Sequence, residues 1–244
     1  MSPAFQIEVC IDHPSDALLA KAAGATRIEI NSALLLDGLT PTIAACRWLK
    51  THCDLPLIAM LRPRDRFFME PAEQEIALED GRLLLDAGVD GLAYGALDRH
   101  GALNLKYVQQ ICDLCGDRDF VCHRAFDRLA DQRLGLQQLI DCGANRVLTS
   151  GGAPTAELGL ARLGELHAWA GGRIEILPGG GIHAGNAVRI AQQSGCRQVH
   201  GSFRARGIAA EPSPGDAWSS EIAAVRRAFD ELDPLRSSSV LKPT

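Results

Sequence analysis

Four segments of the chain repeat one join between a helix and a strand, and this repeat limits the possible folds more than any other feature. The segments are AGATRIEI at 23–30, AGVDGLAY at 87–94, CGANRVLT at 142–149 and SGCRQVHG at 194–201. In each, a glycine takes the position where helices commonly end on a left-handed residue, and a small or apolar residue follows it. A strand pattern begins two residues further on. The four joins predict a chain of repeated helix–strand units.

Apolar stretches typical of strands recur along the chain, with helical periodicity between them. They begin near Gln6, Arg27, Leu55, Gly91, Asp119, Arg146, Ile174 and Gln198. Strands that alternate with helices predict a parallel sheet, because parallel pairing requires a crossover connection. Eight units in about 230 residues fit a closed barrel. A doubly wound open sheet is the alternative, but EVCIDHPSDA after the first strand lacks the G-x-G-x-x-G loop typical of many such folds.

The predicted fold class is therefore α/β, a TIM-barrel-like (β/α)8 single domain over residues 1–233. Residues 234–244, PLRSSSVLKPT, are polar and contain proline, and we expect a loose C-terminal tail there. The net charge of −5 gives no indication of the clustered basic surface that nucleic-acid binding would need. No apolar run approaches the roughly 20 residues that span a bilayer, and the N-terminus lacks a signal-peptide pattern.

The eight cysteines lie mostly within apolar runs, as small buried hydrophobes do in a reducing compartment. We therefore expect a cytoplasmic protein without a disulfide framework. Cys112 and Cys115 form a C-x-x-C motif, but its surroundings are helical and no second motif accompanies it, which favours packing over zinc binding. Trp48, Trp169 and Trp218 fall outside the strands, and an exposed tryptophan could anchor a homodimer or higher homo-oligomer.

Charged residues alternate with aliphatic residues along several predicted strands. Because the aliphatic face must pack under the helices, Glu8, Cys10, Glu29 and Glu175 are expected to face the barrel lumen. Arg62 and Arg64 end the third strand, His123, Arg124 and Asp127 follow the fifth, and His200 lies in the eighth. Alternation leaves open which of His123 and Arg124 faces inward. Active sites of this fold lie at the carboxyl ends of the strands, where these residues gather.

Three chemistries are compatible with these residues. Anion binding would use Arg62, Arg64, Arg124, Ser150, Gly179, Gly180, Gly181, Gly201 and Ser202, since loops after the last strands of such barrels commonly hold phosphate. Proton transfer would use Glu8, Glu29, His123 and Asp127. Metal binding would use Cys10, His123 and His200, a thiol and imidazole set that suits Cu(I). The structural alternatives are a self-paired polar network that only fills the lumen, and glycines that serve only as turns.

Several short motifs follow one another in a fixed order from about residue 6 to residue 230. They are EVC at 8–10, RIE at 27–29, DGLTPT at 37–42, RPR at 62–64, HRAFD at 123–127, LTSGG at 148–152, GGGI at 179–182 and VHGS at 199–202. Together they resemble the CutC family, which is associated with copper homeostasis. The resemblance implies a TIM-barrel-like cytoplasmic protein, often self-associating, with a role in copper handling and no settled reaction.

Two positions depart from the family pattern. Asn31 follows RIEI where relatives usually carry cysteine, which removes a soft ligand beside Cys10, and RPRDRFF replaces RPRGGDF. Two functional hypotheses therefore stand. The first is a cytosolic protein that binds Cu(I), with Cys10 as the best ligand. The second is a barrel enzyme or binder that acts on a small anionic or phosphorylated metabolite at the mouth of the barrel.

Overall fold

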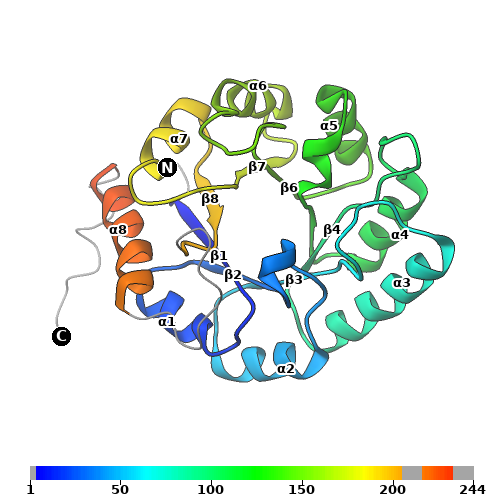
Figure 1. The fold of residues 1–244 in the computed structure, drawn as a ribbon, viewed down its shortest axis with the longest axis horizontal. Coiled ribbons are helices and arrows are strands. Elements are labelled where there is room, and N and C mark those ends of the chain that lie inside the picture. The colour runs from blue at the N-terminus through cyan, green and yellow to red at the C-terminus, as the bar shows by residue number, and fades with distance from the viewer. Residues whose placement is uncertain (1–3, 205–215, 233–244) are drawn as a thin grey trace.

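The computed structural model describes residues 4–204 and 216–232, and it forms a parallel barrel surrounded by helices (Figure 1). Its eight strands are paired in the order β7-β6-β5-β4-β3-β2-β1-β8, and a bridge between Gly179 and His200 links β7 to β8. The strands are β1 (Gln6–Ile11), β2 (Arg27–Ile30), β3 (Leu57–Met60), β4 (Gly91–Tyr94), β5 (Asp119–Cys122), β6 (Arg146–Thr149), β7 (Glu175–Pro178) and β8 (Gln198–Gly201).

A ring of helices covers the outside of the strands. They are α1 (Asp16–Ala22), α2 (Ile43–His52), α3 (Pro71–Asp86), α4 (Leu105–Cys115), α5 (Gln132–Asp141), α6 (Leu160–Ala170), α7 (Ala187–Ser194) and α8 (Asp216–Leu232). Two short 3-10 helices, η1 (Leu34–Leu36) and η2 (Arg124–Arg128), follow β2 and β5. The predicted TIM-barrel-like (β/α)8 fold is confirmed.

The four predicted joins have the geometry that the sequence indicated. Gly24, Gly88, Gly143 and Gly195 have φ angles of 100°, 94°, 84° and 77°. A side chain is disfavoured at such angles, so glycine lets each helix end and the chain turn back toward the next strand. The repeated sequence pattern thus encodes the repeated turn of the barrel.

The lumen is divided into an apolar half and a polar half. Ile58, Met60, Ala93, Val121, Leu148 and Leu177, from β3 to β7, form a separate buried cluster. On β1, Ile7, Val9 and Ile11 are fully buried on the side that packs under the helices. The other face of β1, with β2 and β8, lines the lumen with polar side chains. The predicted alternation therefore holds, and the apolar cluster separates these polar side chains from part of the β3–β7 side of the lumen.

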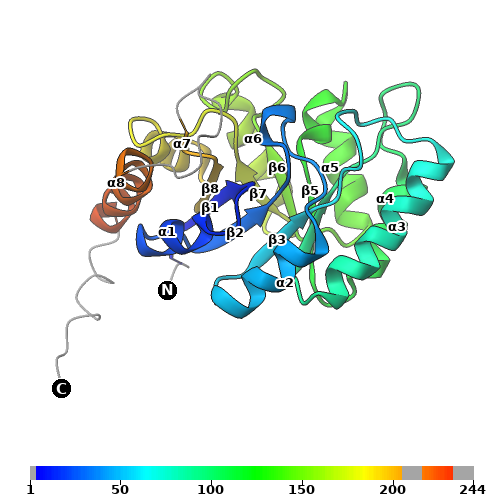
Figure 2. The same ribbon diagram turned by 60° about the horizontal axis from the view of Figure 1, so that its bottom comes forward.

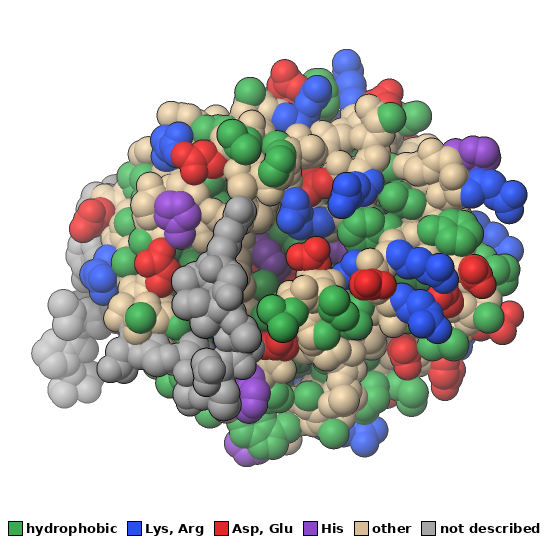
Figure 3. Space-filling view, viewed as in Figure 1, with side chains coloured by type: hydrophobic (Ala, Val, Ile, Leu, Met, Phe, Trp, Pro, Cys, Tyr) green, Lys and Arg blue, Asp and Glu red, His purple; other side chains and the backbone are tan. Residues whose placement is uncertain are grey.

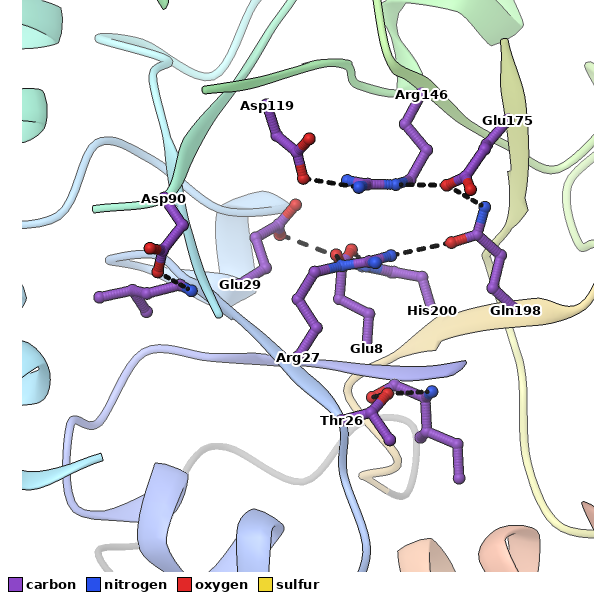
Figure 4. Close-up of polar contacts among 12 residues, drawn as sticks. Glu8, Thr26, Arg27, Glu29, Asp90, Asp119, Arg146, Glu175, Gln198 and His200 are labelled. Carbon is purple, nitrogen blue, oxygen red and sulfur yellow. Dashed lines mark hydrogen bonds and ion pairs between the residues drawn. The ribbon is translucent and has the colours of Figure 1, made fainter. Parts of the chain in front are cut away.

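Two arginines that sequence analysis did not select lie inside the barrel near the amino ends of the strands (Figure 4). Arg27 bonds to Glu8 and, at 2.9 Å, to Gln198. Arg146 donates to Asp119 at 2.6 Å and to Glu175 at 3.0 Å. Glu175 bonds to Arg146 and Gln198 in the lumen, as its predicted inward direction requires, but it lies far from the mouth of the barrel. It begins β7 at the amino ends of the strands, and its side chain is 64% exposed.

The tryptophans differ in their surroundings. Trp218 is buried and donates to the Ser202 carbonyl at 2.7 Å, and Trp169 lies half-buried between two arginines. Trp48 is 37% exposed. The predicted tail at 234–244 lies outside the described residues. Among the helices of the described ranges, none combines the length and apolar character needed to cross a membrane.

Candidate functional site

A cavity of about 700 Å³ opens at the carboxyl ends of the strands. Figure 3 looks into this end of the barrel and shows histidine side chains in a hollow that acidic and basic groups surround. The segment with η1 rises above the strand ends at one side of this opening (Figure 2). The lining residues fall into three groups: a floor of Cys10, Glu29 and His200, a wall of Arg62 and His123, and a rim that includes Arg124, Gly180 and Gly181.

Strand register places the floor residues together. Cys10 on β1 pairs with Glu29 on β2, and Glu8 on β1 pairs with His200 on β8. The Sγ of Cys10, a carboxylate oxygen of Glu29 and a ring nitrogen of His200 lie within 4.8 Å of one another. His200 Nδ1 lies 2.7 Å from Glu8 Oε1, and His200 Nε2 lies 4.0 Å from Glu29 Oε1. The floor therefore presents a thiol, an imidazole and a carboxylate at one point.

The two carboxylates near the floor, Glu8 and Glu29, have pKa values shifted in opposite directions. Burial alone would raise the pKa of Glu8, but the charge of Arg27 and the hydrogen bond with His200 hold that pKa well below its usual range. Glu8 is therefore ionised and has both oxygens engaged. It does not line the cavity, so the structure does not support its predicted role in proton transfer. It orients His200 instead.

The pKa values of Glu29 and His200 are both raised, which favours the neutral carboxyl of Glu29 and the charged ring of His200. Burial raises the pKa of Glu29, and its Oε2 has no hydrogen-bond partner within the described residues. Burial opposes the charged form of His200, but Glu29, Cys10 and Glu8 together raise its pKa well above the usual value. Asn31, at the position that departs from the family pattern, donates from Nδ2 to Glu29 Oε1 at 3.0 Å. The Asn31 amide thus bonds directly to the Glu29 carboxylate of the floor.

His123 forms the opposite wall and answers which residue of the HRAFD motif faces inward. It follows β5, is 2% exposed, and caps η2 by accepting a hydrogen bond at Nδ1 from the Ala125 amide at 3.2 Å. That bond places the ring proton on Nε2, which has no partner in the part of the chain that the structure describes. Burial, then the charge of Arg62, lowers the pKa of His123 to about 3. The ring is a neutral donor.

Arg62 lies beside His123 and is 4% exposed. Its Nη1 donates to the carbonyl oxygens of Leu36 at 2.8 Å and Gly38 at 2.9 Å, which holds the segment around η1 over the cavity. Burial lowers the pKa of Arg62. Arg64, predicted to bind anions with it, instead bonds to Glu73 at 2.7 Å with a side chain 67% exposed. It lies outside the cavity lining.

Asp127 organises the rim. Its carboxylate accepts hydrogen bonds from the Thr149 hydroxyl, from the amides of Ser150 and Gly152 at 3.1 Å and 3.0 Å, and from Arg124 Nε at 2.8 Å. A carboxylate with this many donors fixes the LTSGG loop and is poorly suited to the proton transfer predicted for it. Arg124 Nη2 also donates to Ser150 Oγ at 2.9 Å.

The predicted glycine loops lie at the same rim, with different roles. Gly180, Gly181, Gly201 and Ser202 line the cavity. A Cβ at Gly180 would lie 3.4 Å from Arg124 Nη1, so the loop backbone passes close to that guanidinium. Gly179 and Ser150 support the rim from outside the lining: the Gly179 amide donates to the Thr149 carbonyl at 2.9 Å.

The predicted metal set is only partly brought together. Cys10 and His200 meet, but His123 is not in the group that the described residues form, and Glu29 takes the third position. Sequence reasoning also missed Phe67, whose ring packs 5.3 Å from the His123 ring and 5.0 Å from the Arg62 guanidinium carbon. Alternation along β2 and β6 could have identified Arg27 and Arg146, because each shares a face with a selected residue.

A closed parallel barrel with a polar cavity at the carboxyl ends of its strands defines a TIM-barrel protein with a candidate site in the usual place for that fold. The aldolase QR15 shares this fold, with a TM-score of 0.64 at 12% identity over 93% of this chain and 96% of that one. The CutC family profile matches residues 5–205. The chain belongs to the CutC family, as the sequence motifs indicated.

Relatives over most of the chain carry the same family name. A CutC family protein from Treponema denticola is 43% identical over 210 residues, which cover 86% of this chain and 85% of that protein. A mouse protein named as a copper homeostasis protein cutC homolog is 38% identical over 82% of this chain and 74% of its own length. The crystal structure of CutC from Streptococcus agalactiae has a TM-score of 0.78 at 26% identity and covers 81% of this chain and 98% of that one.

Proposed function

We propose that this protein binds Cu(I) at the cavity floor, through Cys10 and His200 with Glu29 beside them. The observation that carries this proposal is the convergence of a thiol sulfur, an imidazole nitrogen and a carboxylate oxygen within 4.8 Å at the bottom of an open cavity. Thiolate and imidazole are ligands that accept a soft copper ion. The copper homeostasis name of the mouse relative agrees with this assignment.

The surroundings of His200 support a role as a metal ligand. Histidines that bind metals usually donate their other ring N–H to a carboxylate, a backbone carbonyl or water, which fixes the ring and its tautomer. Glu8 holds His200 Nδ1 at 2.7 Å in this way, which leaves Nε2 toward Cys10 and Glu29. Because surrounding groups raise the pKa of His200, Cu(I) would displace the proton on Nε2 when it binds. Asn31 supplies an amide rather than a second thiol, so Cys10 is the one sulfur in the ligand group of the described residues. The affinity therefore depends on Cys10.

Replacing Cys10 by serine is expected to weaken Cu(I) binding by more than the roughly 10- to 100-fold that loss of an outer-shell partner costs, because serine removes the soft ligand itself. The measurement is an anaerobic titration of reduced protein in competition with a chromophoric Cu(I) chelator. Cys112→Ser is the matched control, since Cys112 lies on α4 away from the cavity and bonds to the Cys142 carbonyl. This control should bind one equivalent with the affinity of the unmodified protein.

Two results would contradict copper binding at this floor. One is equal affinity in Cys10→Ser and Cys112→Ser, which would make Cys10 a packing residue. The other is tight binding of Zn(II) with no measurable preference for Cu(I), because sulfur, nitrogen and oxygen ligands also suit zinc. The same titration with Zn(II) separates these outcomes.

We also propose that the protein works in the cytoplasm and self-associates. All eight cysteines lie in described residues and are free thiols, which agrees with a reducing compartment. Trp48 on α2 is the most exposed of the three tryptophans and is the best candidate to anchor a contact between copies. Light scattering of the purified protein and of the Trp48→Ala variant measures the oligomeric state of each, and we expect a smaller assembly in the variant.

A further inference from the structure

We propose that the wall and rim of the cavity bind a small organic phosphate. In this arrangement the phosphate group contacts Arg124 and the amide of Gly181, and a carbonyl or hydroxyl oxygen of the same molecule accepts a hydrogen bond from His123 Nε2. This site is separate from the three floor residues that would hold copper. It gives the cavity a ligand of its own, whether or not copper binds below.

The first argument is the charge of Arg62. Its Nη1 donates to two carbonyl oxygens, its Nε has no partner, and it makes no ion pair within residues 4–204 and 216–232. A buried charge without a counter-ion is costly, so native proteins usually pair it. Asp37 and Asp65 act on its charge, but neither forms an ion pair with it. Because Arg62 lines the cavity, its charge favours the entry of an anion into that space.

The second argument is the unpartnered nitrogen of His123. Buried polar groups are rarely left without a hydrogen bond, and an exception requires an explanation. His123 Nδ1 accepts a hydrogen bond from the Ala125 amide, so the ring proton lies on Nε2. Nε2 can therefore bond only to a hydrogen-bond acceptor, and it has none among the described residues. A neutral imidazole that donates a hydrogen bond is suited to a carbonyl or hydroxyl oxygen, and the ring lines the cavity.

The third argument is the construction of the rim. Arg124 Nε is fixed by Asp127 and its Nη2 by Ser150, so the guanidinium is held in place at the cavity edge. Gly180 and Gly181 have φ angles of 98° and 74°. The Gly179–His200 bridge engages the backbone at Gly180, whereas the Gly181 amide donates to no other described residue. Loops after β7 and β8 commonly hold phosphate in this fold, and here a free Gly181 amide lies in such a loop close to a fixed arginine.

The size of the cavity sets the size of the ligand. About 700 Å³ lies within the range of small-molecule sites, and it leaves room for a few carbon atoms between the rim and the wall. The lining also includes Asp12, Glu29 and Asp37, and these carboxylates would repel a second anionic group away from the rim. The preferred ligand therefore carries one phosphate and one or more neutral oxygens.

The test is calorimetric titration of the metal-free protein with inorganic phosphate, glycerol 3-phosphate and dihydroxyacetone phosphate. We expect the organic phosphates to bind at least tenfold more tightly than inorganic phosphate. Arg124→Gln should weaken all three by about 10- to 100-fold, the cost of losing a hydrogen bond to a charged group. Arg64→Gln is the matched control, because Arg64 is exposed and pairs with Glu73 outside the cavity, and it should leave all three affinities unchanged.

A second variant separates the wall from the rim. His123→Asn keeps an acceptor for the Ala125 amide and removes the Nε2 donor. It should weaken the two organic phosphates by about tenfold and leave inorganic phosphate unaffected. In the unmodified protein, the nitrogen NMR signal of His123 Nε2 should shift with glycerol 3-phosphate and not with inorganic phosphate.

Two results would overturn the proposal. One is no heat and no thermal stabilisation with any of the three probes, since a ligand that binds only the folded state must stabilise it. The other is equal loss in Arg124→Gln and Arg64→Gln, which would indicate only general attraction of anions. Cys10→Ser should keep phosphate binding, and Arg124→Gln should keep Cu(I) binding, so failure at either site is distinguishable from failure at the other.

Discussion

Replacing Glu8 by glutamine is expected to lower the free energy of unfolding by about 3–5 kcal/mol at pH 7, because it removes the anion between two buried cations. Glu8 is 1% exposed, bonds to Arg27 through Oε2 and contacts His200 Nδ1 at 2.7 Å through Oε1. A glutamine of the same shape offers one acceptor oxygen to two donors and no charge. The melting temperature should fall by about 6–20 °C for a domain of this size.

The measurement is urea unfolding followed by circular dichroism, with Asp54→Asn as the control. Asp54 pairs with Lys21 at 2.6 Å, but the two side chains are 76% and 45% exposed. An exposed pair contributes about 0–1 kcal/mol, so the control shows how much the burial of Glu8 matters. A loss below about 1 kcal/mol in Glu8→Gln would mean that other carboxylates compensate for Glu8.

His123 is expected to make the protein sensitive to acid. The pKa of His123 is about 3 in the folded protein and about 6.5 in an unfolded chain. Between these values the unfolded chain binds a proton that the folded protein excludes, so stability falls as the pH falls. The slope is about 1.4 kcal/mol per pH unit, which gives a loss of about 2–3 kcal/mol from this residue at pH 4.5.

The comparison of unfolding free energies at pH 7 and pH 4.5 tests this expectation. The His123→Asn side chain can still cap η2 but cannot titrate. The variant should therefore lose about 2–3 kcal/mol less unfolding free energy between pH 7 and pH 4.5 than the unmodified protein does. His100→Asn, at an exposed position, controls for the substitution itself. Equal losses in His123→Asn and in the unmodified protein would show that His123 takes up a proton in the folded state, and that water reaches its ring.

The sequence predicted the barrel well because the relevant signals are local. The glycine that ends a helix is required by the dihedral angles of that one residue. The alternation along β1 and β2 is visible in residues only two positions apart. Glu8, Cys10 and Glu29 were therefore assigned to the lumen correctly. The family motifs were local in the same sense, since each is a short run at one strand end.

The site was predicted only in part, because the role of a side chain depends on partners distant in the chain. Glu8 and Glu29 have the same chemistry and neighbouring strands, yet Arg27 and His200 hold Glu8 ionised while burial raises the pKa of Glu29. Asp127 lies in a motif that suggested catalysis, but the loop after β6 surrounds it with donors.

The sequence by itself determined the helix–strand repeat, the eight parallel strands, the inward face of the first two, and membership of the CutC family. Only the tertiary structure decided that His123 rather than Arg124 enters the wall, that Arg64 turns outward to Glu73, and that His200 meets Cys10 and Glu29. The physical reason is that strand register and burial set these distances and pKa values, and both arise when segments far apart in the chain close into one barrel.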